Sequence, residues 1–239
     1  LVRRNPPRHE RAVLYLHGGT YISQISSLHW LFADKLCRDT GAEVCVPIYP
    51  LAPAHDHDEA YSLLVDLYEG MVNRYGADKI TIVGDSSGGG LAAGIVETFG
   101  HYDLPQPAQL VLVSPMLDIS MRNPQIHEYF DIDPVLAPWG IAQIGDLWAD
   151  GDDVTLPRLS PINGDVSILR NVTTFVGTRE IFYPDCVKWD EKLEAAGINH
   201  KLVVGVGLNH NWPLSPIPEA RVARKQIAGI VGAGAKGVR

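Results

Sequence analysis

The stretch Gly84 to Gly90, which reads GDSSGGG, constrains the fold of this chain more than any other. It follows a short β-branched run, 79–83, that predicts a buried strand, and it precedes an apolar segment, 91–98, that predicts a helix. A strand, a G-x-S-x-G turn and a helix in this order predict a sharp turn with Ser86 at its tip. Glycines allow backbones to approach closely at such a turn. The free N–H groups and the dipole of the helix start would stabilise negative charge at the same point.

Short apolar segments alternate with segments of helical periodicity along the rest of the chain. This alternation predicts a single α/β domain over residues 1–239, with a mostly parallel sheet flanked by helices on both faces. The stretch 115–168 is too long for an ordinary connection, so we expect an insertion that contributes to the mouth of the site. We expect strands at 11–16, 43–49, 79–83, 109–114, 171–177 and 200–206, and helices at 26–40 (with Leu28, Leu31, Phe32 and Leu36 on one face), 58–75, 91–98, 138–149, 183–196 and 218–231.

Charge and cysteine content exclude several classes of protein. A net charge of −8 argues against a surface that binds nucleic acid or anionic membranes. The three cysteines show no C-x-x-C spacing, which predicts neither a disulfide framework nor a zinc site and favours a cytoplasmic location. No apolar run reaches the roughly 18 residues of a membrane span. The run His55-Asp56-His57-Asp58 lacks the spacing of a helical metal pair, and we interpret it as a polar helix start with Asp58 near the cap.

A nucleophilic serine needs a base to take its proton and a third group to orient that base. In an open parallel sheet such groups gather at the carboxyl ends of the strands. Glu180 follows the fifth expected strand and His210 follows the sixth, so the chain order is Ser86, acid, histidine. That order is the one of the α/β-hydrolase fold. We therefore predict a triad of Ser86, His210 and Glu180, with Asp185 as the rival acid.

Two segments can supply donors for an oxyanion hole, where negative charge develops during acyl transfer. One is the backbone N–H of Ser87, next to the nucleophile, and the other is the N–H pair of Gly18 and Gly19 after the first strand. Asp85 is adjacent to Ser86, so its side chain is badly placed to orient a histidine bonded to that serine. We assign Asp85 a structural role.

With these residues the chain resembles the hormone-sensitive-lipase-like family of α/β-hydrolase carboxylesterases. The resemblance covers about 12–231 and rests on four short motifs and on the Asp133-Pro134 and Ser160-Pro161 pairs. The motifs are His17-Gly18-Gly19, similar to the HGGG loop; Tyr49-Pro50-Leu51-Ala52-Pro53; Gly84 to Gly89; and Gly177-Thr178-Arg179-Glu180 with Asn209-His210. The chain departs from the family pattern where Thr20 replaces the third glycine and Glu180 the usual aspartate. Only sixteen residues precede His17, so we expect a reduced or truncated N-terminal cap.

The triad and this resemblance together predict a serine carboxylesterase, a lipase-like hydrolase that acts through an acyl-enzyme on small esters. We expect short acyl chains to be preferred, and no cofactor or metal to be needed. An amidase or formamidase with the same triad stays open, as does a non-catalytic ligand receptor on the same fold. Trp139, Trp148 and Trp212 could line an apolar pocket or pack in the core. A homodimer also stays open.

Overall fold

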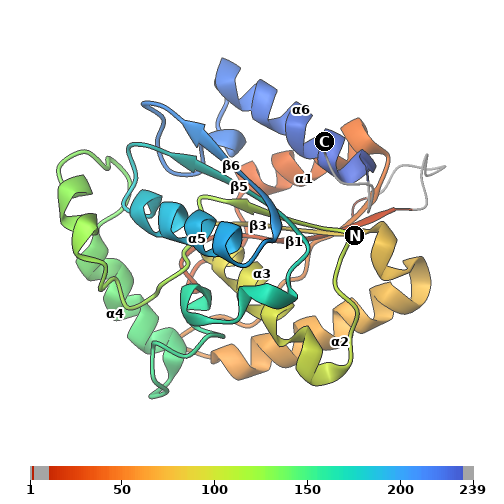
Figure 1. Ribbon diagram of the computed structural model, residues 1–239, viewed down its shortest axis with the longest axis horizontal. Helices are drawn as coiled ribbons and strands as arrows, with labels where there is room; N and C mark the ends of the chain where they lie inside the picture. Colours follow the sequence, from red (N-terminus) through yellow and green to blue (C-terminus); the bar gives the residue numbers. More distant parts are fainter. Residues whose placement is uncertain (1, 3–10, 234–239) are drawn as a thin grey trace.

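Six parallel strands form one sheet in the order β2-β1-β3-β4-β5-β6 in the computed structural model, which describes residue 2 and residues 11–233 (Figure 1). The strands are β1 (Ala12–Leu16), β2 (Glu43–Cys45), β3 (Ile80–Asp85), β4 (Gln109–Val113), β5 (Asn171–Gly177) and β6 (Asn199–Gly205). The α-helices are α1 (Ser27–Thr40), α2 (His57–Tyr75), α3 (Ser87–Thr98), α4 (Pro138–Ala149), α5 (Tyr183–Ala195) and α6 (Pro218–Ala233). Short 3₁₀ turns lie at Ala77–Lys79, Phe99–Tyr102, Pro124–Tyr129, Pro161–Asn163, Val166–Ile168 and Trp212–Leu214. The expected parallel α/β architecture is confirmed.

Helices cover both faces of the sheet. Helices α1 and α6 lie on one face, and α2, α3 and α5 lie on the other (Figure 1). Along β1 the side chains alternate between these layers: Val13 packs with Phe32 of α1 and Ile227 of α6, whereas Leu14 packs in the opposite layer with Leu64 of α2. Successive side chains of a strand point to opposite faces of the sheet, and here the side chains on both faces are buried. The strands are therefore continuous apolar runs in the sequence.

Three expectations about individual elements are wrong. The second strand ends at Cys45 rather than at residue 49, and Pro47, which has no N–H to donate to a ladder, lies just beyond it. Helix α3 begins at Ser87, directly after the serine, rather than at Leu91. The buried stripe of α1 consists of Phe32, Ala33, Leu36 and Cys37, whereas Leu28 is 50% and Leu31 63% exposed.

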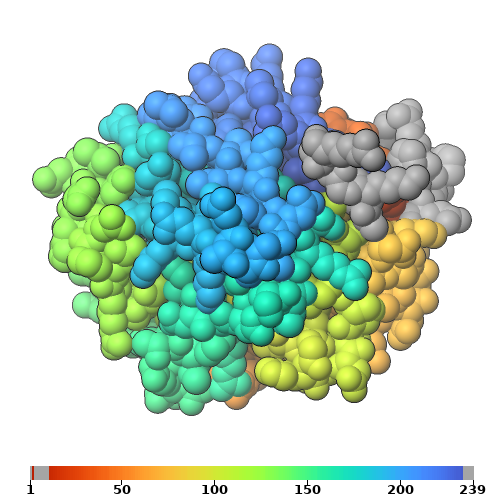
Figure 2. Space-filling view, in the orientation of Figure 1, coloured from red at the N-terminus to blue at the C-terminus, as the bar shows by residue number. Residues whose placement is uncertain are grey.

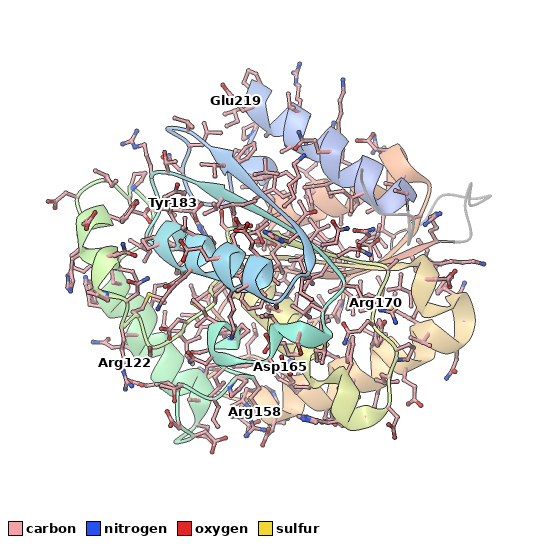
Figure 3. The ribbon with its side chains drawn as sticks, in the orientation of Figure 1. Arg122, Arg158, Asp165, Arg170, Tyr183 and Glu219 are labelled. Carbon is pink, nitrogen blue, oxygen red and sulfur yellow. The ribbon has the colours of Figure 1, made fainter. Side chains whose placement is uncertain are left out.

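The insertion 115–168 contains α4 and lies beside the sheet rather than within it. Its side chains form the left side of the molecule in the space-filling view (Figure 2). Trp148 of α4 stacks on Tyr21, which follows β1, with ring centroids 4.5 Å apart and an interplanar angle of 3°. Arg158, at the lower edge of Figure 3, pairs with Asp58 of α2 at 2.6 Å and with Asp152 at 2.5 Å. The insertion is thus tied both to the segment after β1 and to the start of α2.

The histidine-aspartate run at 55–58 forms the start of α2. Asp56 is the N-cap, and its carboxylate accepts the N–H of Glu59 at 3.1 Å. Asp58, in the first turn, pairs with Arg158 instead. In residue 2 and residues 11–233, no group of three or more His, Cys, Asp or Glu side chains is placed to hold a metal ion. Over the same residues no helix is long and apolar enough to cross a membrane.

Candidate active site

The turn between β3 and α3 holds Ser86 in a conformation that few non-glycine residues adopt. Its φ of 54° and ψ of −125° cost of order 1–3 kcal/mol, which the surrounding structure must supply. The turn is fixed to the neighbouring strand from both sides: Ser86 N–H donates to the carbonyl of Val113 at 2.9 Å, and Met116 N–H donates to the carbonyl of Ser86 at 2.9 Å. Glycine is required at Gly84, because a Cβ there would lie 2.2 Å from the carbonyl oxygen of Gly88.

Two further strand ends bring a histidine and a carboxylate to this serine. The Nε2 atom of His210, which follows β6, lies 3.0 Å from Ser86 Oγ. Its Nδ1 atom lies 2.7 Å from Oε2 of Glu180, which follows β5. The other carboxylate oxygen of Glu180 accepts the N–H of Gly177 at 2.6 Å and the O–H of Ser114 at 2.8 Å. Glu180 is fully buried. Its three hydrogen-bond partners fix the orientation of the carboxylate before any substrate binds.

The segment after β1 lies directly against the serine turn. A Cβ at Gly18 would come within 2.8 Å of Ser86 Cβ, and Gly19 has a φ of +130° that favours glycine. The carbonyl of Gly19 accepts the N–H groups of Ile22 and Ser23. In the part of the chain that the structure describes, no acceptor takes the N–H of Gly18 or Gly19.

Ser87 is the first residue of α3, so its N–H belongs to the first turn, where helical N–H groups have no partner within the helix. Gly18 and Ser87 therefore lie on two sides of Ser86, and the oxyanion role of Gly18, Gly19 and Ser87 stays a prediction. Thr20, at the position of the third family glycine, has a φ of 52°.

A family model described as the alpha/beta hydrolase fold matches residues 13–214 of this chain. The chain belongs to the alpha/beta hydrolase family. The solved structure of a hormone-sensitive lipase from a metagenome library superposes on it with a TM-score of 0.91, at 28% identity, over 96% of this chain and 80% of that one. This match confirms the resemblance to the hormone-sensitive-lipase-like carboxylesterases of the family.

Curated relatives of this hydrolase carry esterase and lipase names. An esterase of Acinetobacter venetianus is 29% identical over 220 residues, which are 90% of this chain and 73% of that protein. A triacylglycerol lipase of Mycobacterium tuberculosis is 27% identical over 203 residues, or 84% of this chain and only 42% of the lipase. An ethyl acetate hydrolase of Pseudomonas putida is 28% identical over 211 residues, or 84% of this chain and 65% of that enzyme. The chain thus spans from under half to about three quarters of these relatives.

Asp185, the rival acid, points to another part of the hydrolase. Its Oδ1 accepts the side-chain N–H of Asn123, from the insertion, at 2.7 Å. Burial raises the pKa of Asp185 to about 6, against the opposing effect of this hydrogen bond. Glu180, and not Asp185, is the carboxylate that the structure brings to His210.

Ser114 and Asn211 also belong to the site, and the sequence reasoning missed both. The Ser114 hydroxyl donates to Glu180 and accepts the N–H of Asn211 at 3.0 Å. The side chain of Asn211 donates to Asp85 Oδ2 at 2.9 Å. Ser114 ends the fourth expected strand, so the rule that located Glu180 and His210 would have found it had it been applied to hydroxyl groups. No sequence signal pointed to Asn211.

The three tryptophans do not form a common wall. Trp148 is buried against Tyr21, and Trp212 is buried against Phe175 with ring centroids 6.2 Å apart. Trp139, in the first turn of α4, is 73% exposed. Two of them therefore pack in the core, and only Trp139 is free to meet a ligand.

Proposed function

We propose that this hydrolase cleaves carboxylic esters through an acyl-enzyme, with Ser86 as nucleophile, His210 as base and Glu180 as the acid that orients the base. The observation that carries the proposal is the line of contacts from Ser86 Oγ to His210 Nε2 at 3.0 Å and from His210 Nδ1 to Glu180 Oε2 at 2.7 Å. Both distances lie within hydrogen-bond reach, which is the geometric requirement for a serine activated by a base.

In the first half-reaction Ser86 Oγ attacks the ester carbonyl while His210 Nε2 takes its proton. The carbonyl oxygen becomes an oxyanion, to which the N–H groups of Gly18, Gly19 and Ser87 donate. Collapse of this intermediate breaks the bond to the alcohol, and His210 returns the proton to the leaving oxygen. The acyl group is then bonded to Ser86.

In the second half-reaction water attacks the acyl carbonyl, and His210 again takes the proton. Collapse of this second intermediate breaks the bond to Ser86 Oγ, His210 gives its proton to that oxygen, and the carboxylic acid leaves. Glu180 holds the imidazole in one tautomer and stabilises the imidazolium that forms in each half-reaction. Every step is a proton or acyl transfer, so the proposal calls for no cofactor.

We further propose that the substrates are small esters with short acyl chains. The name of the Pseudomonas putida relative, an ethyl acetate hydrolase, supports this size class. A series of p-nitrophenyl esters from acetate to decanoate tests it. We expect kcat/KM to fall as the chain lengthens, and a maximum at eight or more carbons would contradict the proposal.

Labelling with a fluorophosphonate tests the nucleophile. The wild type should take up one label per chain, Ser86→Ala should take up none, and ester hydrolysis should disappear with the label. Ser87→Ala is the matched control, because the proposed role of Ser87 uses its backbone N–H, which alanine retains. A folded wild type that takes no label would instead indicate a non-catalytic receptor, and turnover of amides at a rate above esters would indicate an amidase.

A further inference from the structure

Asn211 follows His210 directly and adopts an unusual backbone conformation. Its φ of 56° and ψ of 30° lie in the left-handed region, which asparagine tolerates better than most residues. Its carbonyl accepts the N–H of Leu214 at 2.9 Å, so the chain turns sharply immediately after the histidine. Asn211 therefore forms the turn that directly follows His210.

Two hydrogen bonds connect Asn211 to the two partners of His210. Its side-chain N–H donates to Asp85 Oδ2 at 2.9 Å, and Asp85 precedes Ser86 in the chain. Its backbone N–H donates to Ser114 Oγ at 3.0 Å, and Ser114 in turn donates to Glu180. The contacts thus close two rings, one through the serine and one through the carboxylate, and Asn211 is a member of both.

The surroundings of this contact are buried and already oriented. Asp85 is 0% exposed, and Tyr15 donates its O–H to Asp85 Oδ1 at 2.6 Å. The Oδ1 atom of Asn211 is buried with no hydrogen-bond partner in the part of the chain that the structure describes. The amide thus acts through its N–H group, which donates to Asp85, and not through its oxygen.

We propose that Asn211 is a positioning residue that aligns His210 with both Ser86 and Glu180, through the hydrogen bond of its side chain to Asp85. The inference rests on the proposed function, because it assigns Asn211 a role in that reaction. It also gives Asp85 a role: its carboxylate is the fixed acceptor that connects the serine turn to the histidine turn. A displacement of a reacting group by about 1 Å lowers turnover by roughly 10²-fold.

Asn211→Gly tests the role of the side chain alone, because glycine retains the backbone N–H and adopts positive φ without strain. Asp103→Gly is the matched control, an exposed residue with a φ of 53° that lies in the turn after α3. Active sites are counted by complete reaction with a fluorophosphonate, so that unfolded protein does not enter kcat. We expect kcat per site of Asn211→Gly to fall by about 10- to 100-fold with KM within about twofold of wild type. Asp103→Gly should keep both constants.

A swapped pair tests the contact itself. Asn211→Asp places two carboxylates opposite each other, and the second change Asp85→Asn restores a donor and an acceptor with their roles exchanged. Asp85→Asn alone completes the cycle, because His29 Nε2 also lies 3.3 Å from Asp85 Oδ2. We expect kcat of the double variant to be at least about tenfold higher than kcat of Asn211→Asp. Such a recovery indicates that the two side chains interact directly.

Equal kcat per site in Asn211→Gly and wild type, or a loss confined to KM or to the number of titratable sites, would overturn the role of Asn211 and leave the proposed function intact. A wild type that neither hydrolyses esters nor takes the label would overturn the proposed function as well.

Discussion

Glu180 and Asp185 show how two carboxylates five residues apart are separated by their surroundings. Both are buried, yet Glu180 contacts His210 Nδ1 at 2.7 Å, whereas Asp185 accepts a hydrogen bond from Asn123. In Glu180→Gln the amide oxygen can still accept Gly177 N–H and Ser114 O–H, but the amide NH2 would then face His210 Nδ1, where it can neither accept the imidazole N–H nor balance the imidazolium charge. The strand-end rule places both carboxylates at the same edge of the sheet, so contact with the histidine is what distinguishes them.

We expect Glu180→Gln to lower kcat by roughly 10³- to 10⁴-fold, because the imidazole loses the charge and tautomer control of its partner. Asp185→Asn should retain turnover within about threefold, since its neighbour can reorient to donate to the new amide. Hydrolysis of p-nitrophenyl acetate, with sites counted by fluorophosphonate, measures both. Loss of turnover in Asp185→Asn with retention in Glu180→Gln would show that the triad acid has been misassigned.

Glu97 lies where α3 meets the end of the insertion and α5. A Cβ at Gly164 would lie 1.8 Å from Glu97 Oε2, and neither carboxylate oxygen has a hydrogen-bond partner among the described residues. Nearby, Lys192 of α5 donates to the carbonyls of Ile162 and Gly164. Burial raises the pKa of Glu97 to about 8, although Lys192 lowers it.

This carboxyl makes the junction sensitive to pH. Between its ordinary pKa of 4.5 and about 8, the folded protein binds a proton that the unfolded chain has released, so the contribution of Glu97 to stability falls as pH rises. Glu97→Gln removes this dependence. We expect its free energy of unfolding, relative to wild type, to increase from pH 5 to pH 8 by up to roughly 4 kcal/mol.

Urea denaturation at the two pH values measures this difference. The matched control is Glu191→Gln, on the exposed side of α5, which should show no such change between pH 5 and pH 8. A wild type and a Glu97→Gln variant that respond to pH in the same way would contradict a buried, protonated Glu97.

The sequence predicted the bounds of an element best where a local signal for that element is strong. Strand β5 and helix α4 have the predicted bounds, because β-branched runs and a proline at the first helical position are strong local signals. The buried face of α1 was mispredicted because Leu28 and Leu31 have the right spacing, and only packing against α6 decides which stripe is inside. In the site, the residues with distinctive chemistry could be located by strand ends. Asn211 could not, because an amide beside the histidine does not indicate its own partner, and only the folded chain shows its contact with Asp85.

The two core layers are built on the same strands, because alternate side chains of each strand point into one layer or the other. The layer under α1 and α6 and the layer under α2, α3 and α5 are the two sides of a single sheet, and the insertion packs into the second layer through Trp148. We therefore propose that the described residues 11–233 form one domain, with 115–168 as an insertion that contributes to the site mouth.

One domain predicts one unfolding transition. The midpoints followed by far-UV circular dichroism and by tryptophan fluorescence should coincide, because Trp148 of the insertion and Trp189 and Trp212 of the body are buried in layers that share the sheet. Trp139→Phe is the control, since it removes the exposed tryptophan of the insertion; Trp30 of α1 is 40% exposed and belongs to the body. An earlier fluorescence transition that disappears in Trp148→Phe would show that the insertion unfolds separately.

The order of the strands has a consequence for how this protein acquires activity during refolding. The serine and the histidine that contact each other lie 124 residues apart, at the ends of β3 and of β6, and β6 is the last strand in the described part of the chain and one edge of the sheet. Parallel strands separated by this many residues pair late in folding. The entropy cost of closing the long loops comes before the favourable contacts between the strands. A partly folded chain that lacks β6 has the serine turn but no base beside it. Recovery of esterase activity after dilution from denaturant therefore reports the docking of β6. We expect its rate to be lower than the rate at which helices form.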